Sequence, residues 1–188
     1  MISHLAAAAA AIALGSAPAA TPGVTATTIT IGGTIPISGP AAAYGSVGRG
    51  ADAYFKYVNA KGGVFGRKIV YKYLDDEFDV AKTITLTRQL VEQDQVLAIF
   101  NSVGTEHALA IRSYLNDRQV PQLFLGSGVS KLATEHAKYP WSMGYLPSFA
   151  GEGAIYGRYV AAHRPKARLA ELLAEQPSRP VPYLADHL

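Results

Sequence analysis

From Thr27 to Leu125, segments with the residue pattern of β-strands alternate with segments that have the pattern of α-helices. The expected strands are β-branched or continuously apolar, and they cover residues 27–35, 68–74, 96–100 and 120–125. Helices are expected between them at about 44–61, 79–91 and 105–115, with Asp79 and Thr105 as N-caps of the last two. Because a strand–helix–strand unit places its two strands parallel, this alternation predicts an α/β fold: a mostly parallel sheet flanked by helices.

The alternation weakens after Gly126. Residues 139–145 fit one more short strand, and a helix is expected from about residue 151 to residue 163. Residues 166–175 fit a short helix, but three prolines follow within residues 177–182 and leave no core to join. We therefore expect a first α/β lobe at residues 27–150, and a crossover helix with an aberrant C-terminal segment at residues 151–188.

The first 26 residues have the composition of a leader segment. They carry no charged side chain and include an apolar run from Leu5 to Leu14, which is too short to span a bilayer core of about 30 Å. The run fits the apolar core of a secretory signal followed by small-residue cleavage sites, although no Lys or Arg precedes it. This predicts a periplasmic protein with no membrane span in its mature chain; the alternative is a flexible alanine-rich leader.

Composition excludes several classes of protein. The chain has no cysteine, which rules out a disulfide scaffold, a thiolate nucleophile, a cysteine-held metal and a lipidated cysteine anchor. The formal net charge is +3, and the basic and acidic residues are scattered without a basic stripe. We therefore expect no nucleic-acid partner.

Three loops that follow expected strands contain no charged residue: 36–44, 101–105 and 126–128. In an open parallel sheet, the ligand crevice lies at the carboxyl ends of the strands. These loops offer hydroxyl groups, small residues and helix N-termini, whose unpaired N–H groups suit a carboxylate. Tyr44 begins a helix beside this crevice and is either a core anchor or a ligand contact. The pattern indicates binding of a small molecule without a chemical step.

Motifs for catalysis or cofactor binding are missing or misplaced. Gly45–Gly50 has its glycines in the wrong order for dinucleotide binding, and no P-loop motif occurs. Ser127 lies between two glycines but outside the nucleophile-elbow pattern. The acidic residues at 75–79 could hold a metal, but we interpret them as solvated turn and cap residues. Glu106 and His107 lack zinc-site spacing, and His107 is expected to be exposed. We predict no catalytic residue, no metal and no cofactor.

Several short motifs occur in the order typical of a known family. They are Ser38-Gly39-Pro40 with Tyr44-Gly45, Asn59–Arg67, Asp75–Glu77, Arg88–Val91, Gly104-Thr105, Val120-Pro121, and Pro147–Phe149 with Glu152-Gly153. Through these motifs the chain resembles, from about Thr28 to Pro165, the extracytoplasmic solute-binding proteins of ABC importers, in the branched-chain amino acid-binding family.

The resemblance implies two α/β lobes that close on a small solute, such as a branched-chain amino acid or an amide, for delivery to a membrane permease. In that family the first lobe holds the solute carboxylate through hydroxyls and backbone amides, and an aromatic residue of the first loop packs on the solute. Carried over residue by residue, the resemblance assigns solute binding to Tyr44, Ser102, Thr105, Gly126, Ser127, Gly128 and Phe149.

The chain departs from the family near Lys166-Ala167-Arg168, where the first strand of the second lobe is expected. From Leu169 onward the sequence is rich in Ala and Glu and then in proline, which resembles a truncation or frameshift product. We therefore expect this chain to bind its solute weakly. A ligand-sensing regulatory domain of the same fold is the first alternative function, and a small α/β hydrolase or oxidoreductase is the second.

Overall fold

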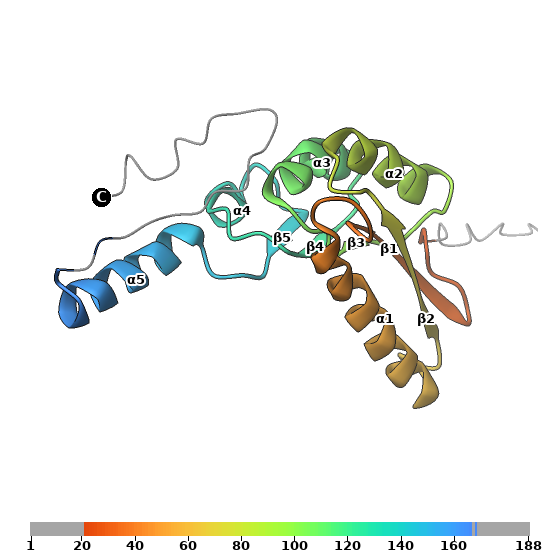
Figure 1. The fold of residues 1–188 in the computed structure, drawn as a ribbon. Helices are drawn as coiled ribbons and strands as arrows, with labels where there is room; N and C mark the ends of the chain where they lie inside the picture. The colour runs from red at the N-terminus through yellow and green to blue at the C-terminus, as the bar shows by residue number, and fades with distance from the viewer. Residues whose placement is uncertain (1–20, 167, 169–188) are drawn as a thin grey trace, which may run out of the picture. The chain divides into compact units, whose positions relative to one another are not determined.

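The computed structural model describes residues 21–166 and residue 168. Within these residues, five strands form one sheet in the order β2-β1-β3-β4-β5, with every neighbouring pair parallel (Figure 1). The strands are β1 (Thr28–Ile35), β2 (Lys68–Asp75), β3 (Ile99–Phe100), β4 (Gln122–Leu125) and β5 (Ser142–Gly144). The α/β fold with a parallel sheet, predicted from the sequence, is confirmed.

Helices connect the strands on both faces of the sheet. They are the 3₁₀-helix η1 (Ala42–Tyr44), α1 (Gly45–Ala60), α2 (Val80–Glu92), α3 (Thr105–Asp117) and α4 (Lys131–Thr134). A further helix, α5 (Phe149–His163), follows the last strand. The chain moves from β1 to β2 in one direction and from β2 to β5 in the other. Right-handed connections therefore place α1 on one face and α2, α3 and α4 on the other. Figure 1 shows α2 and α3 lying together, apart from α1. The chain divides into two compact units after Phe149, so α5 belongs almost entirely to the second unit.

Two apolar clusters hold α3 against the sheet. The first joins α2, α3 and β3, and all its members are at most 2% exposed: Leu90, Val96, Ile99, Ile111 and Leu115. The second joins α3 with β4, α4 and the loop between them: Ala108, Leu125, Val129 and Leu132. Through these clusters, the start of α3 is fixed beside the ends of β3 and β4.

The strands expected at 120–125 and 139–145 are shortened to β4 and β5, and two larger differences from the prediction occur. Of the strand expected at 96–100, only Ile99–Phe100 forms β3; Leu97 and Ala98 bond singly to the β1 backbone, at 2.8 and 2.9 Å, without a ladder. The short helix α4 was not expected, because Lys131–Thr134 shows no helical periodicity. Most of the leader and of the helix expected at 166–175 lies outside the described residues.

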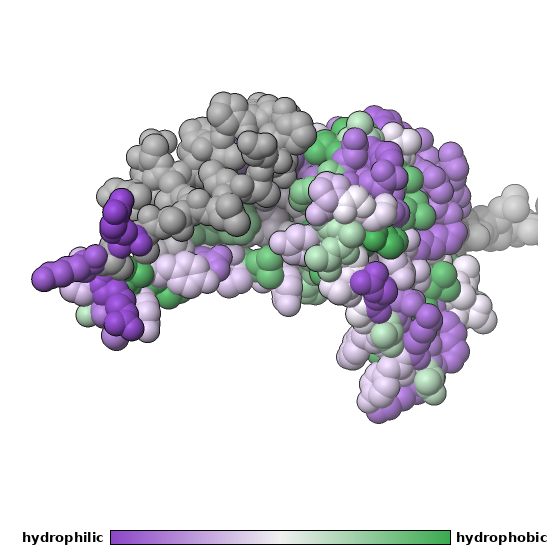
Figure 2. Space-filling model, viewed as in Figure 1, coloured by the Kyte–Doolittle hydropathy of each residue, from purple (hydrophilic) through white to green (hydrophobic). Residues whose placement is uncertain are grey.

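One part of the sheet is uncovered on the α1 face. α1 packs on β1 and β2, whereas Phe124 of β4 and Tyr145 after β5 remain 41% and 65% exposed. With Tyr54, Phe55 and Phe100 they line an apolar hollow of about 420 Å³. Elsewhere, Figure 2 shows hydrophilic and hydrophobic residues interspersed over the helices, as the scattered charges of the sequence lead one to expect.

A buried polar network joins α3 to the last two strands. The Gln122 side chain is fully buried, donating to the carbonyl of Ala108 at 2.9 Å and accepting from the Ser142 hydroxyl at 3.0 Å. Asn116 donates to the Ser142 hydroxyl and accepts from the N–H of Trp141, both at 3.0 Å. This network explains why a strand that is otherwise apolar contains a glutamine.

We predict that Gln122→Ala lowers the free energy of unfolding by about 2–4 kcal/mol, because it leaves buried partners unsatisfied and removes side-chain packing. Urea unfolding followed by circular dichroism measures the change. Gln93→Ala, at an exposed helix end, is the control and is expected to change stability by less than about 0.5 kcal/mol. Equal effects of the two variants would contradict a structural role for the network.

Candidate functional site

The loops after β3 and β4 meet at the carboxyl edge of the sheet. The N–H of Gly126 donates to the Ser102 carbonyl at 2.9 Å, and the N–H of Gly104 donates to the Gly126 carbonyl at 3.3 Å. Val103 and Gly126 form a parallel bridge beyond the named strands. The two loops therefore form one continuous floor, and the loop after β1 ends at the same edge because β1 runs parallel to β3.

The N-terminus of α3 points its backbone donors at this edge. Its first helical hydrogen bond runs from the N–H of Ala108 to the carbonyl of Gly104, so residues 105–107 contribute the N–H groups of the first turn. Gly104 is the N-cap, and no side chain caps the helix. Thr105, predicted to be the N-cap, is instead the first helical residue. The partial positive charge of the helix end is thus left without a side-chain acceptor.

Gly104 occupies a position that only glycine tolerates. Its φ of 109° lies in a region that L side chains rarely adopt, and an added Cβ would lie 2.5 Å from Nδ1 of His107. His107, predicted to be exposed, is 2% exposed and stacks on Phe78 with ring centroids 4.3 Å apart. The prediction was wrong because this helix face packs against the loop after β2.

Thr105 and Ser127 form a pair of hydroxyl groups on the floor. Their oxygens lie 2.8 Å apart, and either hydroxyl could be the donor. Ser127 is 3% exposed and also accepts the N–H of Val129 at 3.2 Å, whereas Thr105 is only half-buried. Thr105 is therefore the hydroxyl of this pair that a molecule at the edge can reach.

Ser102 faces inward rather than toward the edge. Its side chain is fully buried, and its hydroxyl oxygen accepts from the N–H and the hydroxyl of Thr34 at 3.2 and 3.1 Å. The resemblance suggested a solute contact here, but the observed burial gives Ser102 a supporting role between the ends of β1 and β3. The sequence could not distinguish the two roles, because Thr34 lies 68 residues away.

Of the other expected residues, Gly126 and Gly128 follow β4, Tyr44 ends η1, and Phe149 begins α5. Gly126 and Gly128 are at least half-buried; the carbonyl of Gly128 accepts the N–H of Phe149 at 2.8 Å. Tyr44 and Phe149 are 55% and 45% exposed. The exposure of Tyr44 argues against its alternative role as a core anchor. No contact joins Tyr44 to Thr105 in the described chain, so its place in a shared site stays a prediction.

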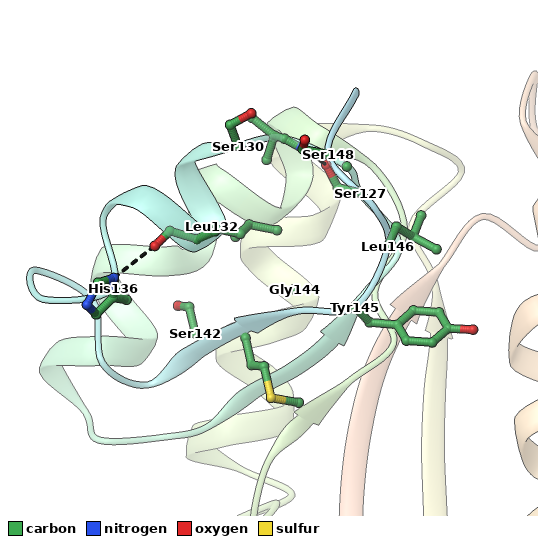
Figure 3. A pocket seen from close by; sticks show the side chains of 13 residues that line it. Ser127, Ser130, Leu132, His136, Ser142, Gly144, Tyr145, Leu146 and Ser148 are labelled. Atoms are coloured by element: carbon green, nitrogen blue, oxygen red, sulfur yellow. Dashed lines mark hydrogen bonds between the residues drawn. The ribbon is translucent and has the colours of Figure 1, made fainter. Parts of the chain in front are cut away.

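A hollow of about 370 Å³ borders this floor (Figure 3). Ser127 and Gly128 contribute to its lining from the loop after β4, α4 contributes Leu132, and β5 contributes Ser142 and Gly144. Its lining combines hydroxyl groups, apolar side chains and the imidazole of His136, and it holds no Asp, Glu, Lys or Arg. The hollow extends the uncharged character of the strand-end loops.

Among the acidic residues at 75–79, Glu77 and Asp79 are exposed as the sequence suggested, whereas Asp75 and Asp76 are held by hydrogen bonds within the fold. Burial would raise the pKa of Asp75, but hydrogen bonds from Ser38 and from the backbone N–H groups of Glu77, Ser38 and Ile37 outweigh burial and lower it to about 2. Asp76 is fully buried, and burial raises its pKa despite a hydrogen bond from Thr83. Asp79 does cap α2, accepting the N–H of Lys82 at 3.0 Å, as predicted.

Residues 21–166 contain neither a cluster of metal ligands nor a membrane-spanning helix. No group of three or more His, Asp or Glu side chains in this part of the chain is placed to hold a metal ion. No helix in the same residues has the length and apolar character needed to cross a membrane.

Comparison with known proteins gives consistent matches. Residues 28–178 match the periplasmic binding protein family. A Leu/Ile/Val-binding protein homolog of Brucella abortus is 35% identical over 119 residues, which are 63% of this chain and 28% of the relative. A second Leu/Ile/Val-binding protein homolog, from Brucella melitensis, is 32% identical over 93 residues, 49% of this chain and 25% of the relative.

Solved structures show the same fold. A possible leucine/isoleucine/valine-binding protein from Rhodopirellula baltica matches with a TM-score of 0.67 and 25% identity, over 79% of this chain and 38% of that one. A branched-chain amino acid transporter substrate binding protein from Streptococcus pneumoniae, in complex with isoleucine, matches with a TM-score of 0.66 and 25% identity, over 73% and 39%. The matched part is thus about a quarter of the curated relatives and under two fifths of these structures.

We predict that Gly104→Ala destabilises the protein by at least about 2 kcal/mol, because the new Cβ adds backbone strain and displaces the buried His107 ring. Gly50→Ala is the matched control: Gly50 lies inside α1 with nothing within 4 Å of an added Cβ, so alanine there is expected to stabilise by up to about 1 kcal/mol. Thermal unfolding of both variants measures the contrast, and a tolerated Gly104→Ala would contradict the described start of α3.

Proposed function

The chain belongs to the periplasmic binding protein family, and from this premise we propose that it is the solute-binding component of an ABC importer. Its relatives and structural neighbours are solute-binding proteins rather than enzymes. The observation that carries the proposal is the uncapped N-terminus of α3 beside the Thr105–Ser127 hydroxyl pair. This arrangement supplies oriented hydrogen-bond donors for an anionic or carbonyl group of a solute.

The solute class that fits this floor is a small molecule with a carboxylate, such as a branched-chain amino acid; an amide would use the same donors through its carbonyl. The backbone N–H groups at the start of α3 and the partial positive charge of the helix end favour an anion. The names of the similar proteins from Brucella, Rhodopirellula and Streptococcus point to the same class. Tyr44 and Phe149 are the exposed aromatic side chains proposed to pack on the apolar part of the solute.

The hydroxyl pair can orient a proton toward the solute. Ser127 accepts from the N–H of Val129 and, in the proposed arrangement, donates its own proton to Thr105. The Thr105 proton is then free to bond a carboxylate oxygen, and each bond of such a chain polarises the next. Ser102 supports the floor from behind and makes no direct contact with the solute.

The location and partner are part of the same proposal. A leader of secretory type at residues 1–26 supports export to the periplasm. There the protein would capture its solute and deliver it to the membrane permease of the importer.

Isothermal titration of the 188-residue chain with leucine, isoleucine, valine and short amides tests the proposal. We expect dissociation constants weaker than micromolar, because the edge of one sheet covers only part of a solute, whereas good small-molecule sites bury roughly 70–90% of their ligand. Micromolar or tighter binding would contradict this account of an incomplete site. Complete absence of binding at high millimolar solute would contradict the proposed function.

The Thr105 hydroxyl has a direct test. Thr105→Val keeps the shape of the side chain but removes the proton offered to the solute, so we expect the dissociation constant for isoleucine to rise by about tenfold. Thr85→Val is the control, because Thr85 is exposed on α2 and its hydroxyl bonds only to the Ala81 carbonyl of its own helix. An unchanged affinity of Thr105→Val would remove Thr105 from the site.

Removing the charge of Glu106 tests whether the carboxylate or the ammonium group of the solute binds at the start of α3. Glu106 is exposed in the first turn of this helix, where its carboxylate repels an incoming anion. We predict that Glu106→Gln tightens isoleucine binding about two- to fivefold. Saturation-transfer NMR on the solute methyl signals measures the affinity. Weaker binding would mean that the ammonium group, not the carboxylate, faces this helix.

A further inference from the structure

The carboxylate of Asp75, the last residue of β2, gathers four hydrogen-bond donors. Its Oδ1 accepts the N–H groups of Ile37 at 2.8 Å, Ser38 at 3.2 Å and Glu77 at 3.0 Å. Its Oδ2 accepts the hydroxyl of Ser38 at 2.7 Å. Three of these donors belong to the loop after β1, where Ile37 and Ser38 precede Asp75 by 38 and 37 residues.

The backbone of that loop is shaped to receive an anion. Pro36 has no N–H, so Ile37 and Ser38 provide the first two donors after β1. Successive N–H groups in a turn form a concave site for an anion, and here an aspartate of the same chain fills it. These hydrogen bonds outweigh burial and hold the pKa of Asp75 at about 2, so the carboxylate is charged at neutral pH. Charge-assisted bonds of this kind are about twice as strong as neutral ones.

A second close contact joins the loop after β1 to the loop after β2. Gly39 has a φ of 78°, and a Cβ added to it would lie 2.7 Å from the carbonyl oxygen of Glu77. At the other end of the loop, a Cβ on Gly45 would lie 3.2 Å from the Pro36 carbonyl. The loop is thus folded back tightly on itself, and the conformation at Ile37 and Ser38 constrains the start of α1 and with it Tyr44.

From this geometry we infer that Asp75 is a positioning residue, which fixes the loop after β1 and thereby places Tyr44 at the solute-binding edge. The part of this inference that concerns the solute rests on the proposed function. Ser38 also lies in a strand-end loop, but its hydroxyl donates a hydrogen bond to Asp75, so we do not propose it as a solute contact. The loop is held in place before a solute arrives, which lowers the entropy cost of binding.

Two substitutions of Asp75 and a matched control test the inference. Asp75→Ala removes every acceptor, whereas Asp75→Asn keeps a carbonyl oxygen for the backbone N–H groups and an amide that can donate to the Ser38 hydroxyl. Glu77→Gln is the control, because it also removes one negative charge, but its side chain pairs only with Lys82 at the surface. Amide hydrogen exchange of the whole chain, resolved by NMR, measures how well the backbone of the loop is protected in the absence of solute.

We expect exchange at Ile37 and Ser38 to accelerate at least about tenfold in Asp75→Ala, and by less in Asp75→Asn, with Glu77→Gln unchanged. Exchange within β1 serves as the internal reference and should stay as in the unmodified chain, which separates local loosening from unfolding. Unchanged protection at Ile37 and Ser38 in Asp75→Ala would overturn the inference.

The second measurement is the dissociation constant of each variant for isoleucine. We expect Asp75→Ala to raise the dissociation constant about tenfold and Asp75→Asn to restore most of the affinity. A loosened loop with unchanged affinity would overturn the placement of Tyr44 by Asp75. If the unmodified chain binds no solute at all, the proposed function fails, and hydrogen exchange alone decides whether Asp75 holds the loop.

Discussion

Parallel strand pairing is the constraint on which the candidate site depends. Because β1, β3 and β4 run in the same direction, the loops that follow them lie at one edge of the sheet. The crossover connections then make each following helix begin at that edge, with its N–H groups and partial positive charge turned toward it. An edge built in this way offers donors to a carboxylate without any charged side chain in its loops, and this suits reversible capture.

The groups that a solute can reach are held in place by groups that it cannot reach. Thr105 is backed by the buried Ser127 hydroxyl, and the floor beneath is tied to β1 through Ser102 and Thr34. The start of α3 is fixed by the apolar clusters on its inner face. The site is therefore a rigid surface, and a rigid surface loses little conformational entropy when it binds a small molecule.

The sequence predicted what depends on local periodicity and capping, and missed what depends on distant neighbours. The alternation of strands and helices, and Asp79 as the cap of α2, follow from short-range patterns and are found in the structure. The burial of Ser102 and His107 could not be read from local patterns, because it depends on Thr34 in β1 and on Phe78 in the loop after β2. The role of Asp75 had one local signal, an acidic residue directly after the strand expected at 68–74, but its partners could be named only from the fold.

The central claim is that the N-terminus of α3 receives the solute carboxylate. Amide chemical shifts of the ¹⁵N-labelled chain, followed during titration with isoleucine, test it most directly. We expect the largest shifts at residues 105–107, Ser127 and Val129. Shifts confined to the exposed aromatic residues Phe124 and Tyr145, with none at the start of α3, would contradict it.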